Sequence, residues 1–72
     1  MDRILYEARN GKMQYVCSPS VPRASLNFLI VCDYGDWSGF RTLNGCERQI
    51  PELETNMKEQ NKLYFYRIVE RV

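Results

Sequence analysis

Apolar and polar residues alternate along the first segment of the chain, on either side of the dipeptide Asn10-Gly11. Asn-Gly is preferred in the two-residue type I′ turn of a β-hairpin, because both central residues of that turn need positive φ. Pairing the chain about this turn gathers apolar and aromatic side chains on one face, namely Ile4, Tyr6, Ala8, Met13, Tyr15 and Cys17. The opposite face is mainly polar, with Leu5 and Val16 as its apolar members. This segregation with a period of two predicts a half-buried β-hairpin over residues 4–17.

An almost continuous apolar segment follows at residues 26–32, after a stretch rich in proline and serine. That stretch, SPSVPRAS at residues 18–25, predicts a loop or crossover. The apolar segment, LNFLIVC, is typical of a strand covered on both faces, although a buried helix starting near Pro22 would show the same pattern. The β-branched pair Ile30-Val31 and the turn-forming residues 33–36 favour the strand.

A second Asn-Gly dipeptide, Asn44-Gly45, lies beyond the sequence DYGDWSG, which predicts a loop over residues 33–39. We expect residues 40–43 to return antiparallel to the preceding strand. Asn44-Gly45 would then start another hairpin, with residues 46–50 as its second strand. That pairing sets Arg41 against Arg48 on the same face, a like-charge pair that costs stability, so the sequence leaves open whether residues 46–50 form a strand.

The last third of the chain predicts a helix and then a strand. Pro51 suits the first helical turn, acidic residues follow it near the positive end of the helix, and Leu53 and Met57 form a narrow apolar stripe. The helix is expected to end at Asn61-Lys62. Residues 62–71, KLYFYRIVER, are dense in β-forming residues and carry apolar side chains on both sides. This double-sided pattern predicts an interior strand, inserted between strands formed earlier in the chain.

Together these elements predict a single α+β domain over residues 1–72. Its sheet would be small, antiparallel or mixed, with four to five strands, one covering helix and the order β-β-β-β-α-β. A chain of 72 residues has room for one domain. Such a chain buries only about 60% of the surface that its unfolded form exposes, so few apolar side chains can be spared for the surface.

Charge and cysteine content narrow the classes of function. Ten basic and nine acidic residues give a net charge of +1, so no long-range field indicates nucleic acid or an anionic membrane. The N-terminal segment lacks the continuous apolar stretch of a signal peptide, and the longest strongly apolar run, residues 28–32, is far too short to cross a bilayer. Three cysteines cannot all pair within one chain, so we expect reduced thiols and a cytoplasmic location.

The residues that most often carry catalysis are missing or isolated. The chain has no histidine, which removes the commonest general acid and base. Cys17 and Cys32 occupy apolar strand positions, where cysteine usually behaves as a small hydrophobe, whereas Cys46, beside Glu47, is expected to be the most exposed thiol. The cysteines lie too far apart in sequence for a zinc site, and no glycine-rich phosphate loop is present. The sequence therefore predicts neither a metal, nor a cofactor, nor an enzyme.

The strongest candidate for binding is the segment from Asp33 to Phe40. Tyr34, Trp37 and Phe40 recur there among glycine, aspartate and serine, and large aromatic side chains can anchor a protein interface. Asp33 and Asp36 would select a basic partner. The alternative is that Trp37 and Phe40 fold back over a small core, which leaves Tyr34 as the most exposed aromatic residue.

A second candidate surface involves tyrosines and the C-terminal strand. The tyrosines that would form a stripe at the core rim or at an interface are Tyr6, Tyr15, Tyr64 and Tyr66. A surface that stacks bases and holds phosphates would consist of Lys62, Tyr64, Tyr66, Arg67 and Arg71. The balanced charge of the chain argues against nucleic acid and favours protein as the partner.

These patterns predict a non-enzymatic protein-binding module that inhibits or modulates a larger protein, of the kind that bacteriophages and mobile elements encode against host machinery. Pairing with a second copy of the chain fits as well, because a small core with an apolar strand gains from a symmetric partner. Binding of single-stranded nucleic acid is the alternative. The sequence does not identify the partner.

Overall fold

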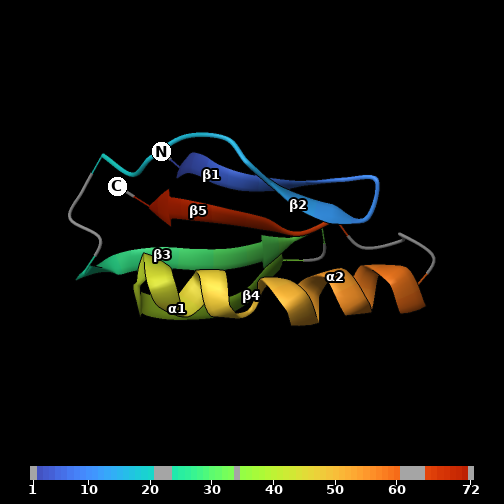
Figure 1. Cartoon of the computed structure of the whole chain (residues 1–72). Helices are drawn as coiled ribbons and strands as arrows, with labels where there is room; N and C mark the ends of the chain where they lie inside the picture. The colour runs from blue at the N-terminus through green and yellow to red at the C-terminus, as the bar shows by residue number, and fades with distance from the viewer. Residues whose placement is uncertain (1, 21–23, 34, 61–64, 72) are drawn as a thin grey trace.

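The computed structural model of the chain describes residues 2–20, 24–33, 35–60 and 65–71, with the backbone alone at residues 2, 24–27 and 35–37. Its elements, in chain order, are β1 (Asp2–Arg9), β2 (Lys12–Tyr15), β3 (Ala24–Cys32), β4 (Gly35–Thr42), α1 (Leu43–Arg48), α2 (Ile50–Glu59) and β5 (Arg67–Arg71) (Figure 1). Four strands precede the helical segment and one strand follows it, and the predicted α+β class is confirmed.

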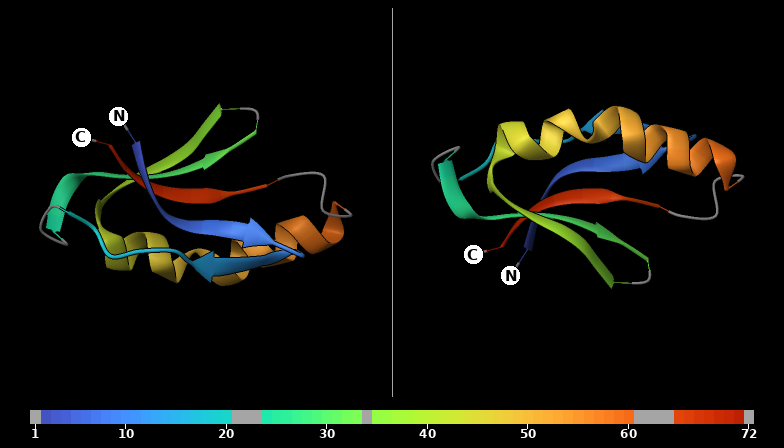
Figure 2. Two further views of the ribbon diagram at one scale, coloured as in Figure 1. Left: turned by 90° about the horizontal axis from the view of Figure 1, so that it is seen from above. Right: turned by 90° about the horizontal axis from the view of Figure 1, so that it is seen from below.

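The five strands form one antiparallel sheet in the order β2-β1-β5-β3-β4. β5, the last strand in the chain, lies between β1 and β3, so the prediction of an interior strand is confirmed. Both helices lie along one face of the sheet (Figure 1). The ends of β3 and β4 that meet at their turn bend toward the opposite side, away from the helices (Figure 2).

The first hairpin forms in the predicted register. Asn10 and Gly11 have φ values of 54° and 78°, which the type I′ turn requires. Tyr6 pairs with Tyr15, and Ala8 pairs with Met13. The Asn-Gly signal therefore predicts both the turn and the pairing of its strands.

A β-bulge at Leu5 alters the face that this residue takes. Its neighbours Ile4 and Tyr6 pair with consecutive residues of β5, so Leu5 is the extra residue in the ladder. Leu5 is fully buried in the core, and the prediction that it belongs to the mainly polar face is wrong. Beyond β2, the Val16 amide donates to the Leu5 carbonyl at 2.7 Å, as the predicted pairing about the turn requires. The Cys17 amide donates to the same carbonyl at 3.4 Å, in place of a pair with Ile4.

The segment after β4 is helical, and the predicted hairpin at Asn44-Gly45 with a strand over residues 46–50 is wrong. Thr42 caps α1, because its hydroxyl oxygen accepts a hydrogen bond from the Gly45 amide at 3.0 Å. The second helix has Pro51 in its first turn, as predicted. Apolar residues spaced by three and four positions form one stripe along both helices, consisting of Leu43, Cys46, Ile50, Leu53 and Met57.

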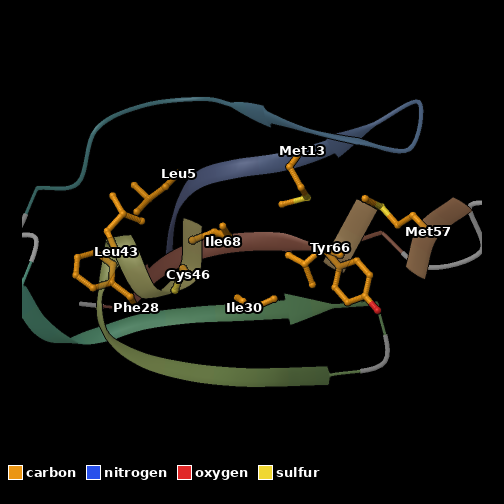
Figure 3. Close-up of a cluster of buried hydrophobic side chains, with 10 residues drawn as sticks. Leu5, Met13, Phe28, Ile30, Leu43, Cys46, Met57, Tyr66 and Ile68 are labelled. Carbon is orange, nitrogen blue, oxygen red and sulfur yellow. The ribbon is translucent and has the colours of Figure 1, made fainter. Parts of the chain in front are cut away.

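The hydrophobic core fills the space between this stripe and the sheet (Figure 3). Its buried members are Leu5, Met13, Phe28, Ile30, Leu43, Cys46, Leu53, Met57, Tyr66 and Ile68. Val31 and Val69 are 8% and 2% exposed although they alternate with core residues and therefore take the opposite face. β3 and β5 are thus buried on both faces, which explains the almost continuous apolar sequence of β3.

β4 takes the place of the loop predicted over residues 33–39, and that prediction is wrong. The last residue of β3 pairs with Gly35, so only two residues connect the strands. Asp36 and Ser38 pair with consecutive residues of β3, which leaves Trp37 as a β-bulge between them. Glycine, aspartate and serine have low strand propensity, so β4 forms because β3 offers a pairing partner, and its own composition contributes little.

Candidate functional site

β4 forms one margin of the sheet, and no other strand of the described chain pairs with its outer side. In the described chain, no backbone group of a loop, turn or cap forms a hydrogen bond with the backbone of β4. Gly39, Arg41 and Thr42 are exposed, and in the view from below β4 crosses the molecule with the helices to one side of it (Figure 2, right). An edge strand in this state presents N–H and C=O groups to which another chain can add a strand.

β2 forms the opposite margin and is better protected. It has only four residues, and the amide of Met13 donates to Oε2 of Glu54 in α2 at 2.9 Å. The Tyr15 hydroxyl lies 2.6 Å from Oγ of Ser18, in the segment that leaves β2. Short length and covering side chains are common means of keeping other chains from an edge. The contrast singles out β4 as the margin that is open to a partner.

The residues predicted to bind a partner lie in the β3–β4 turn and along β4. Asp33 is exposed in the turn, and Tyr34 lies outside the described residues. Asp36 and Trp37 belong to β4, at the bulge. Phe40 is partly buried and packs against the core. Its ring therefore covers the core, as in the second interpretation of the sequence, and is not an exposed anchor for a partner.

Cys46, expected to be the most exposed thiol, is fully buried, so that expectation is wrong. Burial, and to a lesser extent the negative charge of Glu47, raises the pKa of Cys46 from 9.0 to about 12. A thiol with so high a pKa is a poor nucleophile at neutral pH. Cys17 and Cys32 are partly buried free thiols, and Sγ of Cys17 donates to the Ile4 carbonyl at 3.1 Å.

The tyrosines of the first hairpin lie at the rim of the core. The Tyr6 hydroxyl donates to Oε2 of Glu47 at 2.6 Å, and its ring meets that of Tyr15 edge to face, with centroids 5.7 Å apart. Tyr15 is 60% exposed. This arrangement fits the rim interpretation for Tyr6, whose ring packs against the core while its hydroxyl reaches a polar partner.

The surface considered for nucleic acid is only partly displayed on β5. Arg67 and Arg71 are exposed, whereas Tyr66 is 6% exposed and belongs to the core. Its ring therefore does not offer a stacking surface to a base. Lys62 and Tyr64 lie outside the described residues.

Glu70 is the buried charged residue of the described chain, with no exposed surface, and it lies in the central strand. Its Oε1 accepts hydrogen bonds from the amide and the hydroxyl of Ser20, at 2.7 and 2.6 Å. Nε of Arg3 lies 3.7 Å from the same oxygen and donates to the Ser18 carbonyl at 3.2 Å. Glu70 thus ties the segment after β2 to the middle of the sheet. The alternation along β5 predicts its side of the strand, but only the fold brings Ser20 to it.

A groove of about 520 Å³ lies between the β1–β2 turn and α2, and the sequence did not predict it. Its lining consists of Asn10, Gly11, Lys12, Pro51, Glu54, Thr55 and Lys58. Glu54, its one acidic residue, is already engaged with the Met13 amide. The groove lies beside the protected margin of the sheet, apart from β4.

Comparison of the chain with models of protein families, with curated proteins and with solved structures finds no match. Within the described residues, no helix is long and apolar enough to cross a membrane.

Proposed function

We propose that this protein is a non-enzymatic protein-binding module that modulates or inhibits a larger protein by contact through the β3–β4 hairpin. The observation that carries the proposal is the outer edge of β4, which has eight residues and no strand beside it in the described chain. Strand addition at such an edge draws affinity from main-chain hydrogen bonds, and each contributes about 0.5–1.5 kcal/mol net.

Side chains along the same hairpin would supply specificity. Asp33 and Arg41 are exposed and carry opposite charges at the two ends of this surface. Charged groups at the rim of an interface mainly steer the approach of a partner and reject partners of the wrong charge. Asp36, at the bulge, adds a second acidic position near the turn.

The non-enzymatic part of the proposal rests on the chemistry of the chain. It contains no histidine, and the thiol of Cys46 is buried with a raised pKa. Glu70, the buried carboxylate, is engaged by two hydrogen bonds from Ser20. These observations support binding over catalysis.

The proposal is tested by capturing partners from the native cell on the immobilised protein and measuring their affinity for two variants at Gly39. Gly39→Pro removes one backbone N–H from β4, whereas Gly39→Ala keeps it and serves as the matched control. We expect the partner to bind the wild type and Gly39→Ala with similar affinity and to be lost from Gly39→Pro, with all three proteins folded by circular dichroism. Equal binding to both variants, or no specific partner, would contradict the proposal.

A further inference from the structure

We infer that the outer edge of β4 pairs with β4 of a second copy of this chain, antiparallel and centred on Gly39, so that two five-stranded sheets become one continuous sheet. This inference rests on the proposed function in one respect, because it names a partner for the same edge. A second copy and a strand of a larger protein would exclude each other there.

The register of β4 against β3 determines which of its backbone groups point outward. Residues of an antiparallel pair alternate between those that exchange hydrogen bonds with the neighbouring strand and those whose N–H and C=O point away from it. The pair that closes the two-residue turn, Cys32 with Gly35, is of the hydrogen-bonded type. Counting from that pair, Asp36 and Gly39 point away from β3. Arg41 lies where the register against β3 shifts, between Phe40 and Thr42, and the alternation along β4 gives it the same outward direction as Gly39.

The bulge at Trp37 makes the outward positions symmetric about Gly39. The β3 residues opposite Asp36 and Gly39 are two positions apart, because the bulge absorbs one residue of β4. Arg41 lies two residues beyond Gly39 on the other side. Asp36 and Arg41 are therefore at equal distances from Gly39 along the edge, about 7 Å at the ordinary rise of a strand.

A twofold axis at Gly39 would bring Asp36 of one copy opposite Arg41 of the other, and the symmetry creates this pair twice. Opposite charges at facing cross-strand positions stabilise a sheet, and like charges destabilise it. A register centred on Arg41 sets two arginines at facing positions, and one centred on Asp36 sets two aspartates at facing positions. Of the three outward positions, Gly39 is the centre at which both charges find a complement.

Two properties of the described residues favour this pairing. Arg41 is exposed, and the ion pairs found among the described side chains, Arg3 with Glu70 and Arg9 with Glu7, leave it out. Gly39 is exposed, so its backbone is open to a strand on the axis. An exposed arginine and an open stretch of backbone therefore belong to the same edge strand.

Sedimentation equilibrium from micromolar to millimolar concentration tests the dimer and its register. The wild type should associate to twice the 8.6 kDa mass of the chain. Asp36→Arg and Arg41→Asp each set like charges opposite one another and should raise the dimer Kd by about tenfold or more. An equimolar mixture of the two variants should regain the wild-type Kd as a heterodimer, because every facing pair then holds one residue of each charge.

Lys12→Glu is the matched control, since it makes the same change in net charge as Arg41→Asp on the opposite margin of the sheet and should leave the Kd unchanged. Circular dichroism of each variant shows whether it remains folded. A wild type that stays monomeric throughout overturns the inference, as does a mixture of the two charge variants that stays monomeric. The proposed function is judged separately by the Gly39 variants and their partner, so a monomer that binds a larger protein leaves it standing.

Discussion

Replacing Glu70 by alanine removes the acceptor of both hydrogen bonds from Ser20, and we expect this change to lower the free energy of unfolding by about 2–4 kcal/mol. Hydrogen bonds to a charged group contribute about 1.5–3 kcal/mol each, which gives an upper range for two of them. Ser20 itself is exposed and regains water in the variant, which places the loss toward the lower end. Arg3 adds little, because its side chain is 48% exposed and lies 3.7 Å from the carboxylate.

Chemical unfolding in urea, followed by far-ultraviolet circular dichroism, measures this loss. Glu70→Gln keeps a neutral acceptor in place and should cost roughly half as much as Glu70→Ala, because it loses only the contribution of the charge. Glu59→Ala, at an exposed position of α2, is the control and should stay within about 0.5 kcal/mol of the wild type. If Glu70→Ala cost no more than the Glu59 control, the account of Glu70 as the tie between the post-β2 segment and the sheet would be refuted.

Three further outcomes concern the thiol, the helix cap and the turn. The pKa of Cys46 is raised from 9.0 to about 12 in the folded protein, so the unfolded chain loses the thiol proton first as the pH rises above 9. The free energy of unfolding of the wild type should therefore fall by about 1.4 kcal/mol per pH unit above pH 9, relative to that of Cys46→Ala. Urea titrations at pH 8 and pH 10 check this, and an equal pH dependence of both proteins would contradict it. Thr42→Ala should cost about 1 kcal/mol in thermal unfolding, while Thr42→Ser, which keeps the capping oxygen, should resemble the wild type. Gly11→Ala should cost about 1 kcal/mol because φ is 78° there, whereas Gly11→Asn, which tolerates positive φ, should cost less; equal costs would count against the turn.

The parts of the fold that local sequence determines were predictable. The first hairpin follows from Asn10-Gly11 and the alternation around it, and Pro51 with its apolar stripe predicts α2. The interior place of β5 follows from apolar residues on both of its sides. In these segments the local backbone preferences and the spacing of apolar residues indicate the same helix or strand.

The parts that failed depend on contacts between distant segments. Asn44-Gly45 carries a hairpin signal, but the spacing of Leu43 and Cys46 continues the stripe of α2, and burial of that stripe prevails. The composition of β4 is that of a loop, and its strand forms only against β3. The segment predicted to bind a partner was therefore predicted as the wrong kind of structure, an aromatic loop in place of an edge strand.

The central claim is that the outer edge of β4 is a pairing surface for protein, and amide hydrogen exchange tests it residue by residue. In dilute solution the amides of Gly39 and Arg41 should exchange rapidly, because they point away from β3. In concentrated solution a second copy should protect both amides, while the amide of Met13, already bonded to Glu54, should be unchanged. Rapid exchange of Gly39 and Arg41 at every concentration would contradict the pairing of β4 with a second copy. If these amides also stayed unprotected with a captured partner bound, β4 would not be the binding edge.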